Sequence, residues 1–125
     1  MEGGRKPLDW IGSSKKDLGD FPREVKLSLG YSLHLAQMGD KSGDTKPLRG
    51  FGGASVLEVI EDHDGDTYRA VYTVRFEEAI YVLHCFQKKA KSGVETPKQD
   101  IDKIKSRLKL AEERHTKWLE KRKMK

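Results

Sequence analysis

The sequence predicts an α+β protein: a small, mostly antiparallel twisted sheet with two N-terminal helices and one C-terminal helix. Apolar, β-branched runs between residues 54 and 86 are separated by short turns, which indicates strands joined as hairpins. Apolar residues recur at helical spacing on both sides of these runs. The 125 residues suffice for one ordinary domain and not for two. We expect a single domain over 1–125, with residues 1–6 and 120–125 flexible.

The first part of the chain predicts a short strand and then two helices. Residues 8–11 form a brief apolar run that is compatible with a strand. Ser14 and Asp17 have the spacing of a capping box, so a short helix is expected to begin there. Pro22 suits the first turn of a second helix, and Gly39 suits the position after its end. Helical spacing relates the apolar residues of this second helix, which are Val25, Leu29, Leu33 and Ala36.

The second part predicts a loop, three strands and a long helix. Residues 40–53 are rich in glycine and are expected to form the loop. Asp64 and Gly65 lie between two apolar runs, which is a strong hairpin signal. Thr96 and Pro97 have the form of a helix start, with Thr96 as the cap. The expected strands span 54–60, 67–76 and 79–86. The apolar stripe of the last helix contains Ile101, Ile104, Leu108, Ala111, His115 and Trp118.

The positive charge is concentrated in the last third of the chain. The formal net charge is +5, but residues 88–125 hold 14 basic and 6 acidic residues, which gives +8. Residues 1–87 hold 11 basic and 14 acidic residues, which gives −3. A basic segment on a mildly acidic body indicates a polyanionic partner or an acidic protein partner.

Several classes of function and location find no support in the sequence. The single cysteine, Cys85, allows no internal disulfide or cysteine metal site and is interpreted as an inert core residue. No run approaches the roughly 20 apolar residues that span a membrane, and residues 1–6 do not begin a signal peptide. Walker A, GxGxxG and GxSxG motifs are missing. We therefore expect a cytoplasmic protein that uses no metal and no small-molecule cofactor.

The densest set of chemistry-bearing side chains lies where the last predicted strand ends. His84 suits proton transfer because the ordinary pKa of histidine lies near neutrality. Strict alternation places Phe86 on the face of His84 and Val82, where Phe86 can stack on an RNA base. A hydrogen-bonded strand histidine and a core phenylalanine are the alternative interpretations. The strand runs into three lysines suited to phosphate, which are Lys88, Lys89 and Lys91.

Further cationic candidates lie earlier in the chain. Arg69 interrupts an apolar strand, where burial without a partner would be costly. It therefore either faces an open surface and binds phosphate, or pairs with Glu58. Lys46 and Arg49, with Phe51, are expected to close the far side of a groove or to be ordinary loop residues.

These segments, in this order, resemble the phage-derived, HigB-like branch of the RelE/ParE toxin superfamily. The resemblance extends over residues 10–115, and the chain departs from the branch pattern at 92–95, where the basic link is longer. The segments that carry it are Pro47-Leu48-Arg49-Gly50-Phe51, Glu58, Tyr68-Arg69, Leu83-His84-Cys85-Phe86-Gln87-Lys88-Lys89 and Thr96-Pro97.

The resemblance implies a RelE-like fold and the toxin of a type II toxin–antitoxin system. Such a toxin is a ribosome-dependent mRNA endonuclease that cleaves by metal-free attack of the 2′-hydroxyl. The implied partners are mRNA on the ribosome and a cognate helix-turn-helix antitoxin. The candidate catalytic residues are then His84, Arg69, Lys88 and Lys89. The candidate RNA-binding residues are Phe86, Lys91, Lys46 and Arg49.

Two alternatives remain open at this point. The chain is either a non-catalytic, ParE-like binder of a protein target such as gyrase, or a general nucleic-acid-binding protein that uses only its basic third. The combination of His84 with the lysines distinguishes the endonuclease from the protein binder, which would not need them together.

Overall fold

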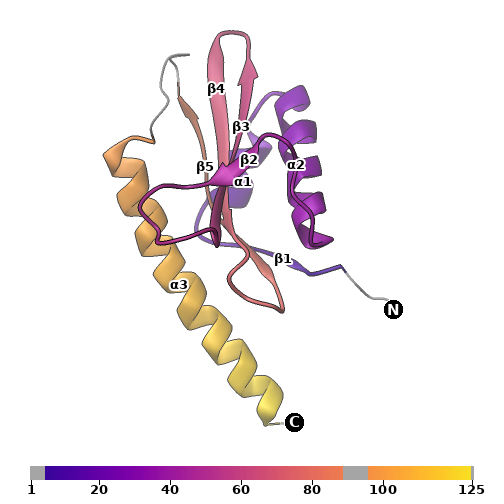
Figure 1. Cartoon of the computed structure of the whole chain (residues 1–125), viewed down its shortest axis with the longest axis vertical. Coiled ribbons are helices and arrows are strands. Elements are labelled where there is room, and N and C mark those ends of the chain that lie inside the picture. Colours follow the sequence, from indigo (N-terminus) through magenta and orange to yellow (C-terminus); the bar gives the residue numbers. More distant parts are fainter. Residues whose placement is uncertain (1–4, 89–95, 125) are drawn as a thin grey trace.

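A computed structural model of the chain describes residues 5–88 and 96–124, and it contains a five-stranded sheet between two helical layers (Figure 1). The strand order is β1-β5-β4-β3-β2, with β1 parallel to β5 and every other neighbouring pair antiparallel. Helices α1 and α2 cover one face, and α3 covers the other. The α+β class predicted from the sequence is confirmed. The elements, in chain order, are β1 (Leu8–Trp10), α1 (Ser14–Gly19), α2 (Arg23–Gln37), β2 (Thr45–Pro47), β3 (Val56–His63), β4 (Asp66–Thr73), β5 (Ile80–Lys88) and α3 (Lys98–Lys123).

The first core lies between α2 and the sheet, as the helical spacing predicts. All four residues of the predicted stripe are buried in it, and Leu29 is fully buried. Gly39 has φ +85°, and it ends the helix with the two hydrogen bonds of a Schellman motif, from Gly39 N to Ala36 O and from Asp40 N to Leu35 O. Cys85 is buried in the same core, and burial raises the pKa of its thiol to about 12. The interpretation of Cys85 as an inert core residue therefore agrees with its surroundings.

The second core lies between α3 and the opposite face of the sheet. Ile104, Leu108 and Ala111 are its buried helical residues. Further along α3, His115 is buried, its Nε2 donates to Glu78 (2.7 Å), and its Nδ1 accepts from the Tyr81 hydroxyl (2.9 Å). The helix continues to Lys123, past the end expected at residue 119, and its last turn projects beyond the strands (Figure 1). Glutamate, lysine and arginine are good helix formers, and basic residues near a helix end favour its dipole.

Three local expectations differ from the structure. Residues 45–47 form the edge strand β2, although the sequence predicts a loop there. Ser13, and not Ser14, is the N-cap of α1, and no side-chain capping bond is present there. Thr96 does not cap α3, because Pro97 occupies the N-cap position. These features depend on partners elsewhere in the chain, which short sequence patterns do not contain.

A β-bulge in β5 changes which side chains face α3. Val71 pairs with His84, but the next residue, Tyr72, pairs with Val82, so Leu83 is the inserted residue. Leu83 belongs to the α3 core and His84 bonds to α3, whereas Val82 belongs to the α2 core. The expectation that Val82 and His84 share a face is therefore wrong, because the bulge interrupts the alternation between them.

Among the described residues, no helix has both the length and the apolar composition required to cross a bilayer.

We expect Leu29→Ala to lower the free energy of unfolding by about 2–5 kcal/mol, because the substitution leaves a cavity in the first core. Leu27→Ala is the matched control on the same helix, since Leu27 is 63% exposed while Leu29 is 0% exposed. The control should change stability by no more than about 0.5 kcal/mol. Urea unfolding followed by circular dichroism measures both. Equal effects of the two substitutions would show that α2 does not pack as described.

Candidate functional site

The sheet register brings four distant segments of the chain into one row facing α3. Lys46 pairs with Glu58, Glu58 pairs with Val71, and Val71 pairs with His84. Directly opposed residues of antiparallel strands project to the same face of a sheet. A second row beside the first contains Ile60, Arg69 and Phe86. Most of the predicted site residues that the structure describes therefore lie on one face.

The centre of this face is a buried ion pair joined by a hydroxyl group. Arg69 is 1% exposed and Glu58 is 2% exposed, and Arg69 Nη1 donates to Glu58 Oε2 at 2.9 Å. Thr96 Oγ1 donates to the same carboxylate oxygen at 2.8 Å and accepts from Arg69 Nη1 at 3.0 Å. Of the two placements predicted for Arg69, the pair with Glu58 is the one present.

His84 lies beside this pair and is held by the beginning of α3. Its side chain is 5% exposed, and its Nε2 donates to Asp100 Oδ1 at 2.8 Å. Its Nδ1 accepts from Arg107 Nη1 at 3.4 Å, and the same guanidinium nitrogen donates to Leu83 O at 3.0 Å. Arg107 thus satisfies a carbonyl at the bulge. These partners fit the neutral ring with its proton on Nε2.

Burial lowers the pKa of His84 below its ordinary value of 6.5 because it penalises the charged ring. The hydrogen bond and the charge of Asp100 oppose this effect, while the positive charges of Arg107 and Lys103 add to it. Burial and the two cations together favour the neutral form of the imidazole.

Phe86 and the lysines complete the predicted cluster. The Phe86 ring stacks on the His84 ring with 4.6 Å between centroids, so the prediction that these two share a face is confirmed. Phe86 also packs against the α3 core and remains partly exposed. Lys88 is the last residue of β5 and pairs with Thr67. Lys89 and Lys91 lie outside the described residues.

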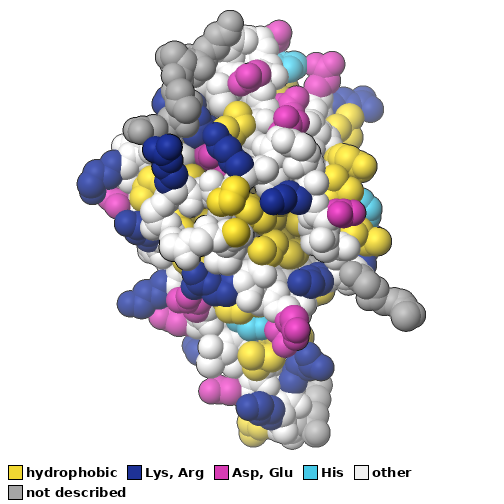
Figure 2. Space-filling model, in the orientation of Figure 1, with side chains coloured by type: hydrophobic (Ala, Val, Ile, Leu, Met, Phe, Trp, Pro, Cys, Tyr) yellow, Lys and Arg dark blue, Asp and Glu magenta, His cyan; other side chains and the backbone are white. Residues whose placement is uncertain are grey.

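A groove of about 620 Å³ opens beside the buried ion pair, between β2, β3 and the start of α3. Lys46 and Arg49 line this groove, which is the first of the two positions expected for them from the sequence. Glu58 and Thr96 line the groove as well, and Ile101 adds an apolar surface. Lys and Arg side chains surround apolar ones on this face of the molecule (Figure 2). Phe51, in contrast, packs against the α3 core.

Three polar residues of this face have no distinctive local pattern in the sequence. Thr96 looks like a helix cap, Asp100 looks like an ordinary first-turn acid, and Arg107 looks like a solvated helical residue. Glu58 enters the sequence prediction only as a partner for Arg69. Its position inside the apolar run Val56–Ile60 is the one local signal of a buried role.

The carboxylates and histidines of the described residues do not form a metal site. Over residues 5–88 and 96–124, no group of three or more His, Cys, Asp or Glu side chains is placed to hold a metal ion. His63, the last residue of β3, lies 3.7 Å from Glu24 and 3.4 Å from Asp64.

The lowered pKa of His84 predicts an acid-sensitive contribution to stability. The unfolded state binds the proton first as pH falls below about 6.5, so the free energy of unfolding should decrease from there down through the folded pKa. We expect His84→Gln to lose this part of the pH dependence, since glutamine can donate to Asp100 without titrating. His34→Gln is the control, because His34 is an exposed histidine of α2. Urea midpoints between pH 5 and pH 8 measure the effect. A wild-type pH dependence in His84→Gln would contradict the assignment.

Comparison with known proteins identifies the family of this chain. The family described as "Phage derived protein Gp49-like (DUF891)" matches residues 16–109. No curated protein matches significantly. One chain of the RelBE2 toxin–antitoxin complex from Mycobacterium tuberculosis is similar, with a TM-score of 0.46 and 16% identity over 70% of this chain and 97% of that chain. The match to residues 16–109 covers most of the chain and confirms the phage-derived branch predicted from the sequence. The protein belongs to the phage-derived Gp49-like family.

Proposed function

We propose that this protein is the toxin of a type II toxin–antitoxin system and that it cleaves mRNA on the ribosome, in the cytoplasm. The observation that carries the proposal is the composition of the groove, where Lys46 and Arg49 flank the buried carboxylate of Glu58. Membership of the phage-derived family and the resemblance to the HigB-like toxins support the same function. The partner that neutralises such a toxin would be a helix-turn-helix antitoxin.

The groove residues suit metal-free cleavage of RNA. In this reaction the 2′-oxygen attacks phosphorus and the bond from phosphorus to the 5′-oxygen breaks. The 2′-hydroxyl loses a proton, the phosphorane requires positive charge, and the 5′-oxygen gains a proton. In our proposal, Glu58 accepts the first proton, Lys46 and Arg49 bind the phosphate, and a lysine protonates the leaving oxygen. We propose that one of Lys88, Lys89 and Lys91 donates this proton and that the others bind further phosphates.

Arg69 and His84 lie behind the groove wall in this proposal and position the groups that touch RNA. Arg69 holds the Glu58 carboxylate, and His84 holds Asp100 and thereby the first turn of α3. Phe86 lies against His84 and is proposed to stack on a base. Loss of toxicity in an Arg69→Ala variant would not identify a catalytic role. Removing one partner of a buried ion pair costs about 3–5 kcal/mol of stability.

A non-catalytic binder on the same scaffold is the second candidate. The burial of both Arg69 and His84 favours it, since two predicted catalytic side chains have structural partners instead of open surroundings. Toxic expression with intact mRNA would support this second candidate and contradict the first.

We expect the double variant Lys46→Ala/Arg49→Ala to abolish growth arrest and to weaken RNA binding, because it removes two phosphate-binding cations from the groove. The slope of log affinity against log salt should become shallower by roughly 0.7 for each phosphate that is no longer neutralised. Lys105→Ala/Lys109→Ala is the matched control, with the same number of cations removed from exposed positions on α3. Growth curves after induction and salt titrations of ribosome binding measure both pairs. Full toxicity of the groove variant would contradict the proposed site.

We expect cleaved mRNA to carry a 2′,3′-cyclic phosphate or its 3′-phosphate product, since the 2′-oxygen is the nucleophile. Mapping of mRNA ends on purified ribosomes measures this. Cleavage should survive a brief EDTA challenge that leaves ribosomes intact, with sedimentation as the control for ribosome integrity. Products with a 5′-phosphate and a 3′-hydroxyl would indicate attack by an activated water and would overturn the mechanism.

A further inference from the structure

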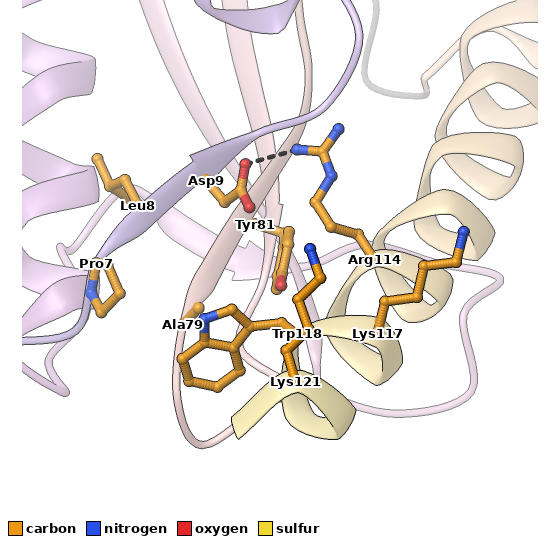
Figure 3. A pocket seen from close by; sticks show the side chains of 9 residues that line it. All are labelled: Pro7, Leu8, Asp9, Ala79, Tyr81, Arg114, Lys117, Trp118 and Lys121. Atoms are coloured by element: carbon orange, nitrogen blue, oxygen red, sulfur yellow. Dashed lines mark hydrogen bonds and ion pairs between the residues drawn. The ribbon is translucent and has the colours of Figure 1, made fainter. Parts of the chain in front are cut away.

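A second pocket lies far from the groove, between β1 and the C-terminal half of α3 (Figure 3). Its volume is about 460 Å³. Pro7, Ala79 and Trp118 contribute apolar and aromatic side chains to its lining, and basic side chains of α3 stand around it. These basic residues are Arg114, Lys117 and Lys121.

The floor of this pocket is formed before any partner binds. Tyr81 donates to His115, which donates to Glu78, so the phenol ring is fixed by a buried network. The indole of Trp118 stacks on His115 with 5.4 Å between centroids and remains 39% exposed. A pre-formed apolar surface loses little conformational freedom on binding, which favours it as an anchor site.

The charge around the pocket is positive. Asp9 is the one carboxylate among the residues that line it, and Arg114 Nη1 donates to Asp9 Oδ1 at 2.7 Å. Lys117 and Lys121 project from adjacent turns of α3, on the helix side of the pocket (Figure 3). The guanidinium of Arg122 lies 4.8 Å from the centre of the Trp118 ring and adds to the positive charge. The electrostatic complement of this surface is acidic.

We propose that this pocket docks an acidic segment of a partner protein. A bulky apolar side chain of the partner enters between Pro7 and Trp118, and flanking carboxylates lie beside Lys117 and Lys121. Apolar anchors surrounded by complementary charges are a common basis of protein recognition. The proposal does not depend on the endonuclease function.

RNA fits this pocket less well than an acidic peptide. RNA would need an open aromatic face for base stacking, but Trp118 is already stacked with His115 and Arg122.

The pocket and the groove lie near opposite ends of α3. Ile101 lines the groove and Arg114 lines the pocket, and 13 residues of helix between them correspond to about 20 Å. A partner held at the pocket therefore leaves the groove open. Such a partner would anchor the protein without covering its cationic groove.

The test uses the full chain and two short peptides. The acidic hexapeptide Asp-Glu-Glu-Phe-Glu-Asp carries an apolar anchor, and a version with serine in place of phenylalanine lacks it. Trp118 emission reports occupancy of the pocket in a Trp10→Phe background, because the chain has 2 tryptophans. We expect the phenylalanine peptide to shift this emission and to bind at least roughly tenfold more tightly than the serine peptide.

Reversing the charge of Lys117 and Lys121 tests whether the peptide binds at this pocket. Lys117→Glu/Lys121→Glu should lower the affinity for the phenylalanine peptide roughly tenfold relative to the control variant. The control is Lys105→Glu/Lys109→Glu, which makes the same charge change at exposed positions outside the pocket. Circular dichroism checks that all variants fold.

Four outcomes would overturn the proposal. They are no shift of Trp118 emission by the phenylalanine peptide, equal affinity of the two peptides, equal weakening by the two charge reversals, and a stronger response to a hexauridylate oligonucleotide. Sedimentation provides the fifth test, since a dimer that disappears with Lys117→Glu/Lys121→Glu would assign the pocket to a second copy. None of these results bears on mRNA cleavage, so failure here is distinct from failure of the proposed endonuclease function.

Discussion

The buried pair of Arg69 and Glu58 is the constraint on which the α3 face of the molecule depends. Two charges removed from water are stable only when each is paired and hydrogen-bonded, and Thr96 supplies the third group. The pair joins β4 to β3, and Thr96 ties it to the residues just before α3. The carboxylate reaches the groove from this fixed position. A side chain held by packing and hydrogen bonds is the kind of preorganised group that catalysis requires.

A second set of contacts holds the first turns of α3 over the sheet. His84 binds Asp100, while Arg107 reaches from the next turns to the bulge in β5 and to the Ser13 hydroxyl near α1 (3.2 Å). Gly12 has φ +59°, and a side chain there would meet the Arg107 guanidinium at 2.9 Å, so the close approach requires glycine. The groove is the space left between this anchored helix start and the short edge strand β2. The contacts of α3 with the sheet and the pairing of β2 with β3 together form the two sides of the groove that Lys46 and Arg49 line.

Much of the fold follows from local patterns. The stripe of α2, the hairpin at Gly65 and the end of α2 at Gly39 follow from apolar spacing and from backbone conformation, which neighbouring residues determine. The bulge at Leu83, strand β2 and the role of Thr96 depend on partners distant in sequence, and no local pattern specifies them. The candidate site also combines features that local patterns predict with features that depend on distant residues. Alternation within β5 relates His84 to Phe86, whereas the pairing of Arg69 with Glu58 and Thr96 requires the sheet register.

The claim that mRNA occupies the groove beside Glu58 can be tested by photocrosslinking on the ribosome. A photoreactive phenylalanine replaces Pro47, an exposed groove residue, or Leu27, an exposed residue of α2. The protein is then bound to ribosomes programmed with mRNA whose 2′-hydroxyls are methylated, so that the strand stays intact. Crosslinks to mRNA from position 47 and none from position 27 are the expected result. Crosslinks from position 27 alone, or from neither position in a protein that still binds programmed ribosomes, would contradict it.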